Sequence, residues 1–266
     1  MIISDVSISS PQLKAYAGLT QKQALEQGVF IAESVNVIQS ALDAGIRPLS
    51  LLCERRHAEG KAAELIRRLG DVPVFTPSDE EIRRLTGYEL SRGVLCEMVR
   101  PQQVPAEKAL DGAKSCAVLE DVRDETNLGA IFRSAAALGI DAVILCGGCS
   151  DPLSRRAARV STGAVFRLPW ARLPALNEGG ADELKRLGFT LCALALSENS
   201  EGPEALRHIA RPALVLGNEG EGLSPAALAK CDRTICVPMR RGVDSLNVSA
   251  AAAIAFWEAG KQDAGE

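Results

Sequence analysis

Three polar stretches rich in glycine, asparagine and acidic residues each follow a short apolar run. They span residues 119–134, 215–224 and 237–249. The second reads Val-Leu-Gly-Asn-Glu-Gly-Glu-Gly-Leu-Ser, and its three glycines leave the backbone open to close approach by a ligand. Its two carboxylates, Glu219 and Glu221, would repel a phosphate. The stretch therefore favours a neutral or cationic ligand, such as a sulfonium, held by bare backbone N–H groups.

Taken alone, this glycine-rich stretch has a second interpretation. Short glycine patterns recur by chance, and such a turn can merely lead a strand into a helix. Ser224 and Pro225 suit the N-cap and first position of that helix in either case. The two other polar stretches favour a ligand site, because all three would converge at one edge of a sheet.

The elements around these stretches predict an α/β domain with a mainly parallel sheet. Short apolar runs alternate with helical segments, as is typical of strands covered on both faces. The predicted strands are 116–119, 142–146, 190–196, 213–216 and 234–237. Ligands of such sheets bind at the carboxyl ends of the strands, which is where the polar stretches lie.

A smaller α/β domain precedes this one. Strands are predicted at 29–31, 49–53, 72–75 and 94–99, and helices at 34–44, 61–69 and 79–85. Two prolines and several polar residues interrupt the periodic pattern at 101–107. We therefore predict a boundary there, with domains spanning residues 1–104 and 105–266.

Composition and charge narrow the class of protein. The chain of 266 residues has a formal net charge of -4, which argues against nonspecific polyanion binding, so any nucleic-acid contact must be local. No apolar run approaches the roughly 20 residues of a membrane span, and the N-terminus lacks a signal-peptide pattern. We expect a cytoplasmic protein that does not engage a membrane.

Metal and histidine chemistry are not predicted. The chain has only two histidines, His57 and His208, and both lie outside the polar stretches. Its eight cysteines fall mostly in apolar runs, which predicts reduced, buried thiols. The pattern Cys146-Gly-Gly-Cys149 lacks the second pair of a zinc site, so a buried cysteine beside a glycine turn explains it. We therefore predict no metal ligand.

The residues of the three stretches follow a specific pattern. The pattern consists of Asp124-x-x-Asn127-x-Gly129 with Arg133, then Leu216 to Gly222, then Pro238-Met239 followed by Ser245-Leu-Asn-Val-Ser249. In order and spacing it resembles the three motifs of the SpoU/TrmH-type RNA ribose methyltransferases, members of the SPOUT class. The family often has proline where this chain has Glu125, and glycine where it has Arg241. Segments 28–33, 92–95 and 156–169 also resemble the family, so nearly the whole chain is covered.

The resemblance implies a fold and a reaction. The C-terminal domain would be a SPOUT α/β domain with a deep trefoil knot, which no periodicity predicts because knots are so rare. The α/β domain before it would resemble a ribosomal protein and bind the RNA substrate. The reaction would be S-adenosylmethionine-dependent methylation of a ribose 2'-hydroxyl in structured RNA, with ribosomal RNA favoured over transfer RNA.

The resemblance also assigns candidate site residues. Catalytic roles fall to Asn127, Arg133, Glu219, Ser245 and Asn247. Cofactor binding falls to Gly217, Asn218, Gly220, Val237, Met239 and Leu246. The residues alone leave other roles open: Asn127, Ser245 and Asn247 are suited to capping helices, and Glu219 to a solvated turn.

Arg133 bears most directly on the chemistry. In the family this arginine activates the 2'-hydroxyl, but an arginine resists deprotonation. Stabilisation of a developing alkoxide, together with phosphate contact, is therefore the favoured role. Gly129 lies one helical turn earlier, so the guanidinium could pass over the missing side chain toward the strand end. A surface or salt-bridging arginine is the alternative.

Other basic residues would suit a phosphate-bearing substrate. Arg156 and Arg159 lie in the family-like segment 156–169, and Arg155 lies just before it. Arg240 and Arg241 follow the last predicted strand. Arginine pairs at 55–56, 67–68 and 83–84 could extend this surface in the first domain, although such pairs on helices are usually solvated.

The final helix predicts burial on several sides, because residues 249–257 are apolar nearly all round. Burial inside one subunit and an interface between subunits fit this pattern equally well. The resemblance implies a homodimer formed through the C-terminal domain.

Two other classes of function stay open. A nucleotide-binding dehydrogenase is disfavoured, because no G-x-G-x-x-G follows the first strand of either domain. A noncatalytic RNA-binding or ribosome-assembly protein on a methyltransferase fold is harder to exclude. The retained polar residues of the three motifs argue against it.

Overall fold

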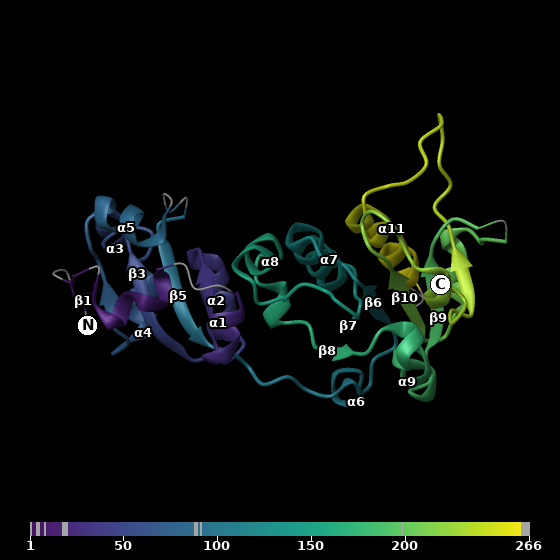
Figure 1. Cartoon of the computed structure of the whole chain (residues 1–266), viewed down its shortest axis with the longest axis horizontal. Coiled ribbons are helices and arrows are strands. Elements are labelled where there is room, and N and C mark those ends of the chain that lie inside the picture. The colour runs from purple at the N-terminus through teal and green to yellow at the C-terminus, as the bar shows by residue number, and fades with distance from the viewer. Residues whose placement is uncertain are drawn as a thin grey trace. The chain divides into compact units, whose positions relative to one another are not determined.

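The computed structural model describes residues 2–3, 6–7, 9–17, 21–87, 90, 92–197 and 199–261. The chain divides into two units (Figure 1). The first unit contains residues 1–102 together with 153–166, and the second contains 103–152 together with 167–266. A segment between two strands of the second unit therefore belongs to the first. In the described part of the chain, no helix is long and apolar enough to cross a membrane.

The first unit is built on a five-stranded mixed sheet in the order β1-β4-β3-β5-β2. Its strands are β1 (Ile2–Ile3), β2 (Val29–Glu33), β3 (Pro48–Cys53), β4 (Val74–Phe75) and β5 (Val94–Val99). β5 runs antiparallel to both of its neighbours, whereas β1, β4 and β3 are parallel. The four strands predicted for this region are confirmed, and the two-residue β1 was not predicted.

Helices of the first unit follow from local signals. They are η1 (Pro11–Tyr16), α1 (Gln21–Glu26), α2 (Val35–Asp43), α3 (Arg55–Ala58), α4 (Ala63–Leu69), α5 (Asp79–Thr86), α8 (Arg155–Val160) and η2 (Ala164–Phe166). Ser78 and Glu81 form a capping box at the start of α5, and Gly87 ends it in the left-handed conformation. Ile82 of α5 is buried with Leu52 and Phe75 of the sheet, which fixes this helix on the core.

The second unit confirms the predicted parallel sheet. Its six strands are all parallel in the order β11-β9-β10-β6-β7-β8. They are β6 (Cys116–Glu120), β7 (Ala142–Cys146), β8 (Trp170–Leu173), β9 (Thr190–Leu194), β10 (Pro212–Leu216) and β11 (Arg233–Ile235). Five of them were predicted. β8 was not, because this short edge strand lacks a continuous apolar run.

Helices cover both faces of this sheet, with α7 and α11 on one side and α6 and α9 on the other (Figure 1). The helical elements are α6 (Ala106–Ala109), α7 (Glu125–Ala137), η3 (Leu176–Glu178), α9 (Gly180–Arg186), η4 (Pro203–His208), α10 (Pro225–Leu228) and α11 (Val248–Gly260). α11 packs on α7, η4 and β10. The sheet is thus a buried central layer, as parallel sheets generally are.

The strand order creates a switch point between β6 and β10, which are neighbours. The chain leaves β6 for α7 on one face, and it leaves β10 for α10, whose Ala227 lies in the core of the other face. Diverging connections leave a crevice at the carboxyl ends of such strands, and this crevice is where ligands of open α/β sheets bind.

Candidate active site

Three loops that carry the motif residues start at the carboxyl edge of the second sheet. The first loop (residues 121–124) follows β6, the second loop (217–224) follows β10, and the third loop (236–247) follows β11. β6 and β10 are adjacent, while β9 separates β10 from β11. The first and second loops are therefore neighbours by topology.

Glu219 of the second loop connects the first two loops. Its carboxylate accepts backbone N–H groups of Arg123 and Asp124, at 3.4 and 3.1 Å. It also accepts the side-chain amides of Asn127 and Asn218, at 3.3 and 3.4 Å. Four neutral donors thus converge on one carboxylate. Glu219 is exposed in its turn, and this arrangement also makes it an anchor for the entry of α7.

Asn127 and Asn247 extend this network to the third loop. Asn247 Nδ2 donates to Asn127 Oδ1 at 3.0 Å, so the Asn127 amide is held from both sides. Asn247 Oδ1 in turn accepts the Ser249 N–H at 2.8 Å as the N-cap of α11. The predicted capping role of Asn247 is confirmed. We define the hydrogen-bonded set Glu219, Asn127, Asn247 and Asn218 as the polar cluster.

The capping role that the residues alone left open for Asn127 is taken by another residue. The N-cap of α7 is Asp124, whose carboxylate accepts the Asn127 N–H at 2.8 Å. Asp and Asn are about equally good N-caps, and here the earlier aspartate starts the helix three residues before an Asn127 cap would. This shift puts Asn127 inside the first turn and frees its amide for the polar cluster. Glu125 takes the first helical position, where the proline common in the family would also fit.

The second loop is a tight turn closed by its own backbone. Asn218 and Gly222 exchange N–H to carbonyl hydrogen bonds at 3.0 and 2.9 Å. Asn218 Oδ1 also accepts the N–H groups of Gly220 and Glu221, at 2.9 and 3.2 Å. The expectation of bare amides is therefore wrong for these positions, because the turn uses their N–H groups internally. The carboxylates of the loop still favour a positively charged ligand.

Gly217 is required by this turn. A Cβ there would lie 2.3 Å from the carbonyl carbon of Gly222 and 2.5 Å from the Leu223 nitrogen. Both contacts are with backbone, so the turn itself would have to move. We expect Gly217→Ala to lower the free energy of unfolding by about 1–3 kcal/mol through overpacking. Chemical denaturation would measure this loss, and an unchanged midpoint would contradict it.

Asp121 is a site residue that the sequence analysis missed. It adopts a left-handed conformation with φ 55°. Its carboxylate accepts the Gly148 N–H at 2.8 Å, and its carbonyl accepts Asn218 Nδ2 at 3.0 Å. Asp121 thereby ties the β6 loop to the loops after β7 and β10. An acidic residue directly after a buried strand was the only signal for it.

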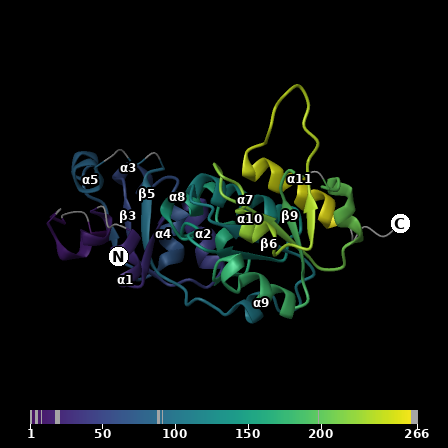
Figure 2. The same cartoon turned by 45° about the vertical axis from the view of Figure 1, so that its right-hand side comes forward.

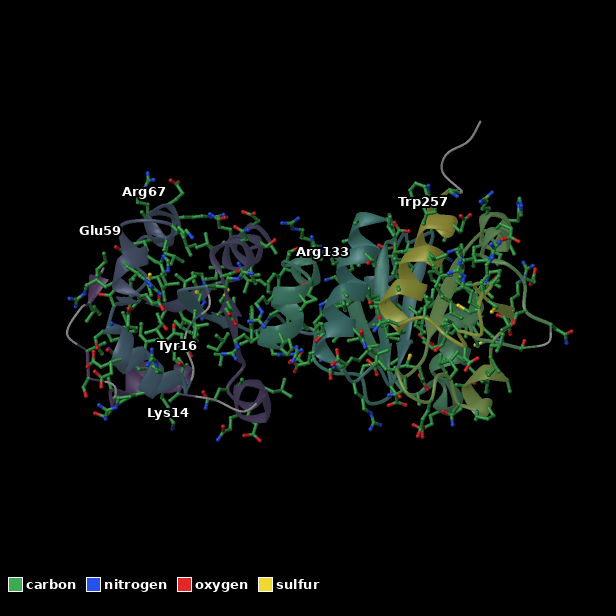
Figure 3. The ribbon with its side chains drawn as sticks, turned by 90° about the horizontal axis from the view of Figure 1, so that it is seen from above. Lys14, Tyr16, Glu59, Arg67, Arg133 and Trp257 are labelled. Atoms are coloured by element: carbon green, nitrogen blue, oxygen red, sulfur yellow. The ribbon has the colours of Figure 1, made fainter. Side chains whose placement is uncertain are left out.

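Arg133 lies on α7 with its side chain exposed (Figure 3). Within the described residues its side chain makes no hydrogen bond or ion pair. It lies six positions after Asn127 on the helix that the polar cluster anchors. Gly129, one turn earlier, is buried.

The third loop extends away from the sheet (Figures 1 and 2). Residues 240–247 are all exposed, and Leu246 is 38% exposed. Val237 and Met239 are half-buried, and the Ser245 hydroxyl makes no hydrogen bond within the described residues. Of the candidates in this loop, only Asn247 joins the polar cluster.

Arg241 explains one departure from the family pattern. It adopts φ 59°, and Gly242 follows with φ 71°. The left-handed conformation favours glycine, so the glycine common in the family fits this position without strain. In this chain an arginine takes the same conformation at the tip of the third loop.

Cys146 and Cys149 are free thiols, and neither forms a disulfide. Cys149 Sγ donates to the Leu119 carbonyl at 3.1 Å and accepts the Val122 N–H at 3.3 Å. Burial raises the pKa of Cys149 to about 11. The prediction of a buried cysteine beside a glycine turn is confirmed. Among the described residues, no group of three His, Cys, Asp or Glu side chains could hold a metal ion.

The raised pKa predicts slow alkylation of Cys149. Because the thiolate is the nucleophile, a pKa near 11 leaves about one thiol in a thousand ionised at pH 8. We expect iodoacetamide to leave Cys149 unmodified in the folded protein and to label it after denaturation. Peptide mass spectrometry would measure both states. Rapid labelling of the native protein would contradict the buried geometry.

A fourth loop was also missed. Residues 195–200 follow β9, whose place in the sheet is between β10 and β11. This loop therefore starts between the second and third loops. Its Leu196 is 77% exposed, the largest exposed fraction among the large hydrophobic residues of the described chain. The available signal in the sequence was the long apolar run 190–196, which ends in a leucine.

The comparisons with known proteins agree with this geometry. The model of the SpoU rRNA methylase family matches residues 114–257, which span the sheet and all three motif loops. The chain belongs to the SpoU rRNA methylase family. The resemblance to SpoU/TrmH-type enzymes is thereby confirmed.

Relatives in the SpoU family cover most of the chain. A protein of Mycobacterium tuberculosis named as a tRNA/rRNA methyltransferase is 41% identical over 243 residues, covering 87% of this chain and 81% of its own. The 23S rRNA (guanosine(2553)-2'-O)-methyltransferase of Bacillus subtilis is 35% identical over 191 residues, covering 68% of this chain and 75% of its own.

Solved structures support the SpoU fold over the whole chain. An AdoMet-bound rRNA methyltransferase from Sinorhizobium meliloti matches with a TM-score of 0.80 at 25% identity, covering 97% of both chains. The SpoU methyltransferase AviRb from Streptomyces viridochromogenes matches with a TM-score of 0.79 at 26% identity, covering 94% of this chain and 95% of its own.

Proposed function

We propose that this protein transfers the methyl group of S-adenosylmethionine to a ribose 2'-hydroxyl of RNA, with ribosomal RNA as the substrate. The observation that carries the proposal is the polar cluster, which joins three motif loops of a SpoU-family domain through Glu219, Asn127 and Asn247. Relatives named for 2'-O-methylation of 23S rRNA support the choice of RNA. Ribosomal RNA as substrate would place the enzyme in the cytoplasm.

The residues around the second loop fit S-adenosylmethionine. Glu219 and Glu221 supply negative charge, which suits a cationic sulfonium. Leu196 and Leu246, exposed by 77% and 38%, supply apolar surface for an adenine ring. We assign cofactor binding to Gly217, Asn218, Gly220, Val237, Met239 and Leu246, with Leu196 added from the strand order. The trefoil knot implied by the resemblance would enclose this pocket.

The reaction requires few protein groups. When bound, S-adenosylmethionine supplies an electrophilic methyl group on sulfur. Held by residues such as Gly217, Val237 and Leu246, it would give this methyl group to the ribose oxygen and leave as a neutral thioether, while the hydroxyl proton would pass to solvent. We assign to Arg133 the stabilisation of the developing alkoxide, because a guanidinium stays protonated and favours negative charge beside it. Asn127, Glu219, Ser245 and Asn247 hold the loops and the ribose in position.

RNA recognition is assigned to the first domain, residues 1–104, and to arginines near the motifs. Arg240 and Arg241 lie on the exposed third loop, where a phosphate backbone could reach them. The prediction of a domain that resembles a ribosomal protein and binds RNA stays a proposal.

Two measurements, made one after the other, test the proposed function. Isothermal titration calorimetry with S-adenosylmethionine tests the pocket, and transfer of tritiated methyl to bulk ribosomal RNA tests the reaction. Mapping of 2'-O-methyl sites in cells lacking the protein identifies the nucleotide. Cofactor binding without transfer to any RNA would instead support a noncatalytic RNA-binding protein, and absence of binding would reject the cofactor.

A homodimer through α11 is part of the proposal. α11 buries Ala252, Ala255 and Phe256 inside the unit, while Ile254 and Trp257 remain 36% and 57% exposed (Figure 3). Burial inside one subunit is confirmed for one face of the apolar helix, and the exposed face supports the proposal of an interface. A second copy of the chain is the partner that the family resemblance implies.

The exposed face of α11 predicts a single-residue disruption of the dimer. We expect Trp257→Glu to convert the protein to a monomer, because it places a charge at the centre of an apolar contact. Light scattering after size exclusion would measure the mass. A wild-type protein that is monomeric at high concentration would reject the dimer, and an unchanged dimer in the variant would reject this face.

A further inference from the structure

We propose that α8 and Glu33 form a binding surface for the phosphate backbone of the RNA substrate. The proposal rests on the proposed function, which makes RNA the substrate, and it adds where and how the first unit contacts it. The surface comprises Glu33 at the end of β2 and Arg155, Arg156 and Arg159 on α8. We call this set the α8 surface.

Glu33 is a buried carboxylate that holds two arginines. It is 2% exposed, and both of its oxygens accept Arg159 Nη1, at 3.0 and 3.1 Å. Arg155 Nε lies 3.5 Å from the same carboxylate. A buried carboxylate is costly to desolvate, and a well-packed apolar residue would stabilise the fold at least as well. The position of Glu33 therefore indicates a role in holding the arginines.

One carboxylate cannot neutralise the three arginines that α8 carries. Three other arginines of the first unit have their own acids: Arg56 pairs with Glu54, Arg67 with Glu64, and Arg68 with Asp43. Arg67 and Arg68 on α4 are thus neutralised by these acids and lie on the solvated surface, as is usual for arginine pairs on helices. On α8, Arg155 and Arg159 share the Glu33 carboxylate, and Arg156 has no ion pair within the described residues.

The donors of the α8 surface are accessible to a ligand. Arg159 contacts Glu33 through Nη1 alone, and its Nε and Nη2 make no other hydrogen bond within the described residues. Its side chain is 39% exposed. Arg156 is exposed and has no hydrogen bond or ion pair in the part of the chain that the structure describes. A guanidinium held on one side and open on the other matches the fork geometry that binds phosphate.

The charge of the two units agrees with this assignment. The first unit has 15 Lys and Arg against 13 Asp and Glu, a net charge of +2. The second unit has 15 against 21, a net charge of -6. Electrostatic attraction to RNA therefore favours the first unit, and the α8 segment supplies three of its basic residues.

Arg156→Ala tests the surface without disturbing the fold, because its side chain has no protein partner to lose. We expect the Kd for labelled 23S ribosomal RNA to rise about three- to tenfold, with the slope of log K against log salt reduced by about 0.7–0.9. Arg67→Ala is the matched control in the same unit, labelled in Figure 3, and it should bind as the wild type does. Equal affinity of Arg156→Ala and the wild type, or equal losses in both variants, would overturn the proposal.

Glu33→Gln tests whether the carboxylate positions the arginines. Removing a negative charge should tighten RNA binding if only net charge matters. If positioning matters, binding should weaken about threefold or more although the protein becomes more positive. Tighter binding by this variant would reject the positioning role.

A fold check and an independent readout complete the experiment. If Glu33→Gln fails to fold by circular dichroism, Arg159→Lys replaces it, since lysine keeps the charge and loses the fork. Unchanged affinity in Arg159→Lys would then reject positioning. Calorimetry with S-adenosylmethionine should give the same Kd for all variants. RNA binding is measured without methyl transfer, so the α8 surface and the proposed reaction fail separately.

Discussion

Replacing Arg133 with alanine is expected to lower kcat for methyl transfer by about 10²- to 10³-fold, the usual loss when one preorganised donor to a developing oxyanion is removed. The fold should be unaffected, since Arg133 is exposed and its side chain has no ion pair within the described residues. We therefore expect a change in the free energy of unfolding within about 0.5 kcal/mol. Single-turnover kinetics at saturating S-adenosylmethionine would measure the effect.

The controls for Arg133 separate charge from shape. Arg133→Lys keeps a cation without the fork, and added guanidine should partly restore Arg133→Ala if the guanidinium group itself is required. Arg186→Ala removes another exposed arginine, which is paired with Glu183 and Glu107. Arg186 lies on α9, and this helix leads to the start of β9, at the edge of the sheet opposite the motif loops. It should turn over normally. Near-normal turnover by Arg133→Ala would remove Arg133 from the reaction.

The pH dependence of the Arg133 variants addresses its mechanism. An arginine that acts as a base would add an ionisation to the pH–rate profile, which the alanine variant would lose. Electrostatic stabilisation predicts a lower rate at every pH with an unchanged profile shape. We expect the second result, because arginine remains protonated under ordinary conditions.

Glu219→Gln is expected to have the second largest effect. The glutamate accepts four N–H donors, two from the backbone of the first loop and two from asparagine amides. A glutamine keeps one oxygen and turns an NH₂ group toward the remaining donors. We expect about a 10²-fold loss of kcat/KM, because a misplaced first loop moves α7 and the groups that it carries.

Glu221→Gln is the matched comparison for Glu219. Both carboxylates lie exposed in the second loop, but the Glu221 side chain makes no hydrogen bond within the described residues. We expect the loss of kcat/KM in Glu221→Gln to be at least ten times smaller than the loss in Glu219→Gln. Equal losses would mean that loop charge, rather than the anchoring of α7, accounts for the effect.

The sheet of the second unit was predictable because its strands are continuous apolar runs. β6, β7 and β10 bury all of their residues and β9 buries its three central ones, as their continuous apolar runs indicate. Their order was not predictable, since the contact between β6 and β10 joins residues about a hundred positions apart in sequence. The position of the switch point therefore had to come from the structure.

Local competition explains the errors at the site. Asp124 and Asn127 are both good N-caps, and the sequence does not rank two caps three residues apart. In the second loop, glycine was interpreted as exposure of the backbone to a ligand. Gly217 instead makes room for the returning backbone of Gly222, and Asn218 binds the amides that a ligand was expected to use.

The roles of Arg133 and Ser245 follow from the family resemblance and not from contacts in the structure. The resemblance assigned them roles, yet neither side chain makes a hydrogen bond within the described residues. Groups that act on a substrate often lack partners in the protein itself, because the substrate completes their coordination. Pattern recognition therefore identifies them more readily than packing does.

The placement of residues 153–166 in the first unit has a consequence for biosynthesis. Glu33 emerges from the ribosome 126 residues before Arg159. At about 5–20 residues per second, its carboxylate waits roughly 6–25 seconds for its partner. The first unit thus gains α8 only after β6 and β7 have been translated, and a nascent chain arrested at residue 102 would lack the Arg159 partner of Glu33.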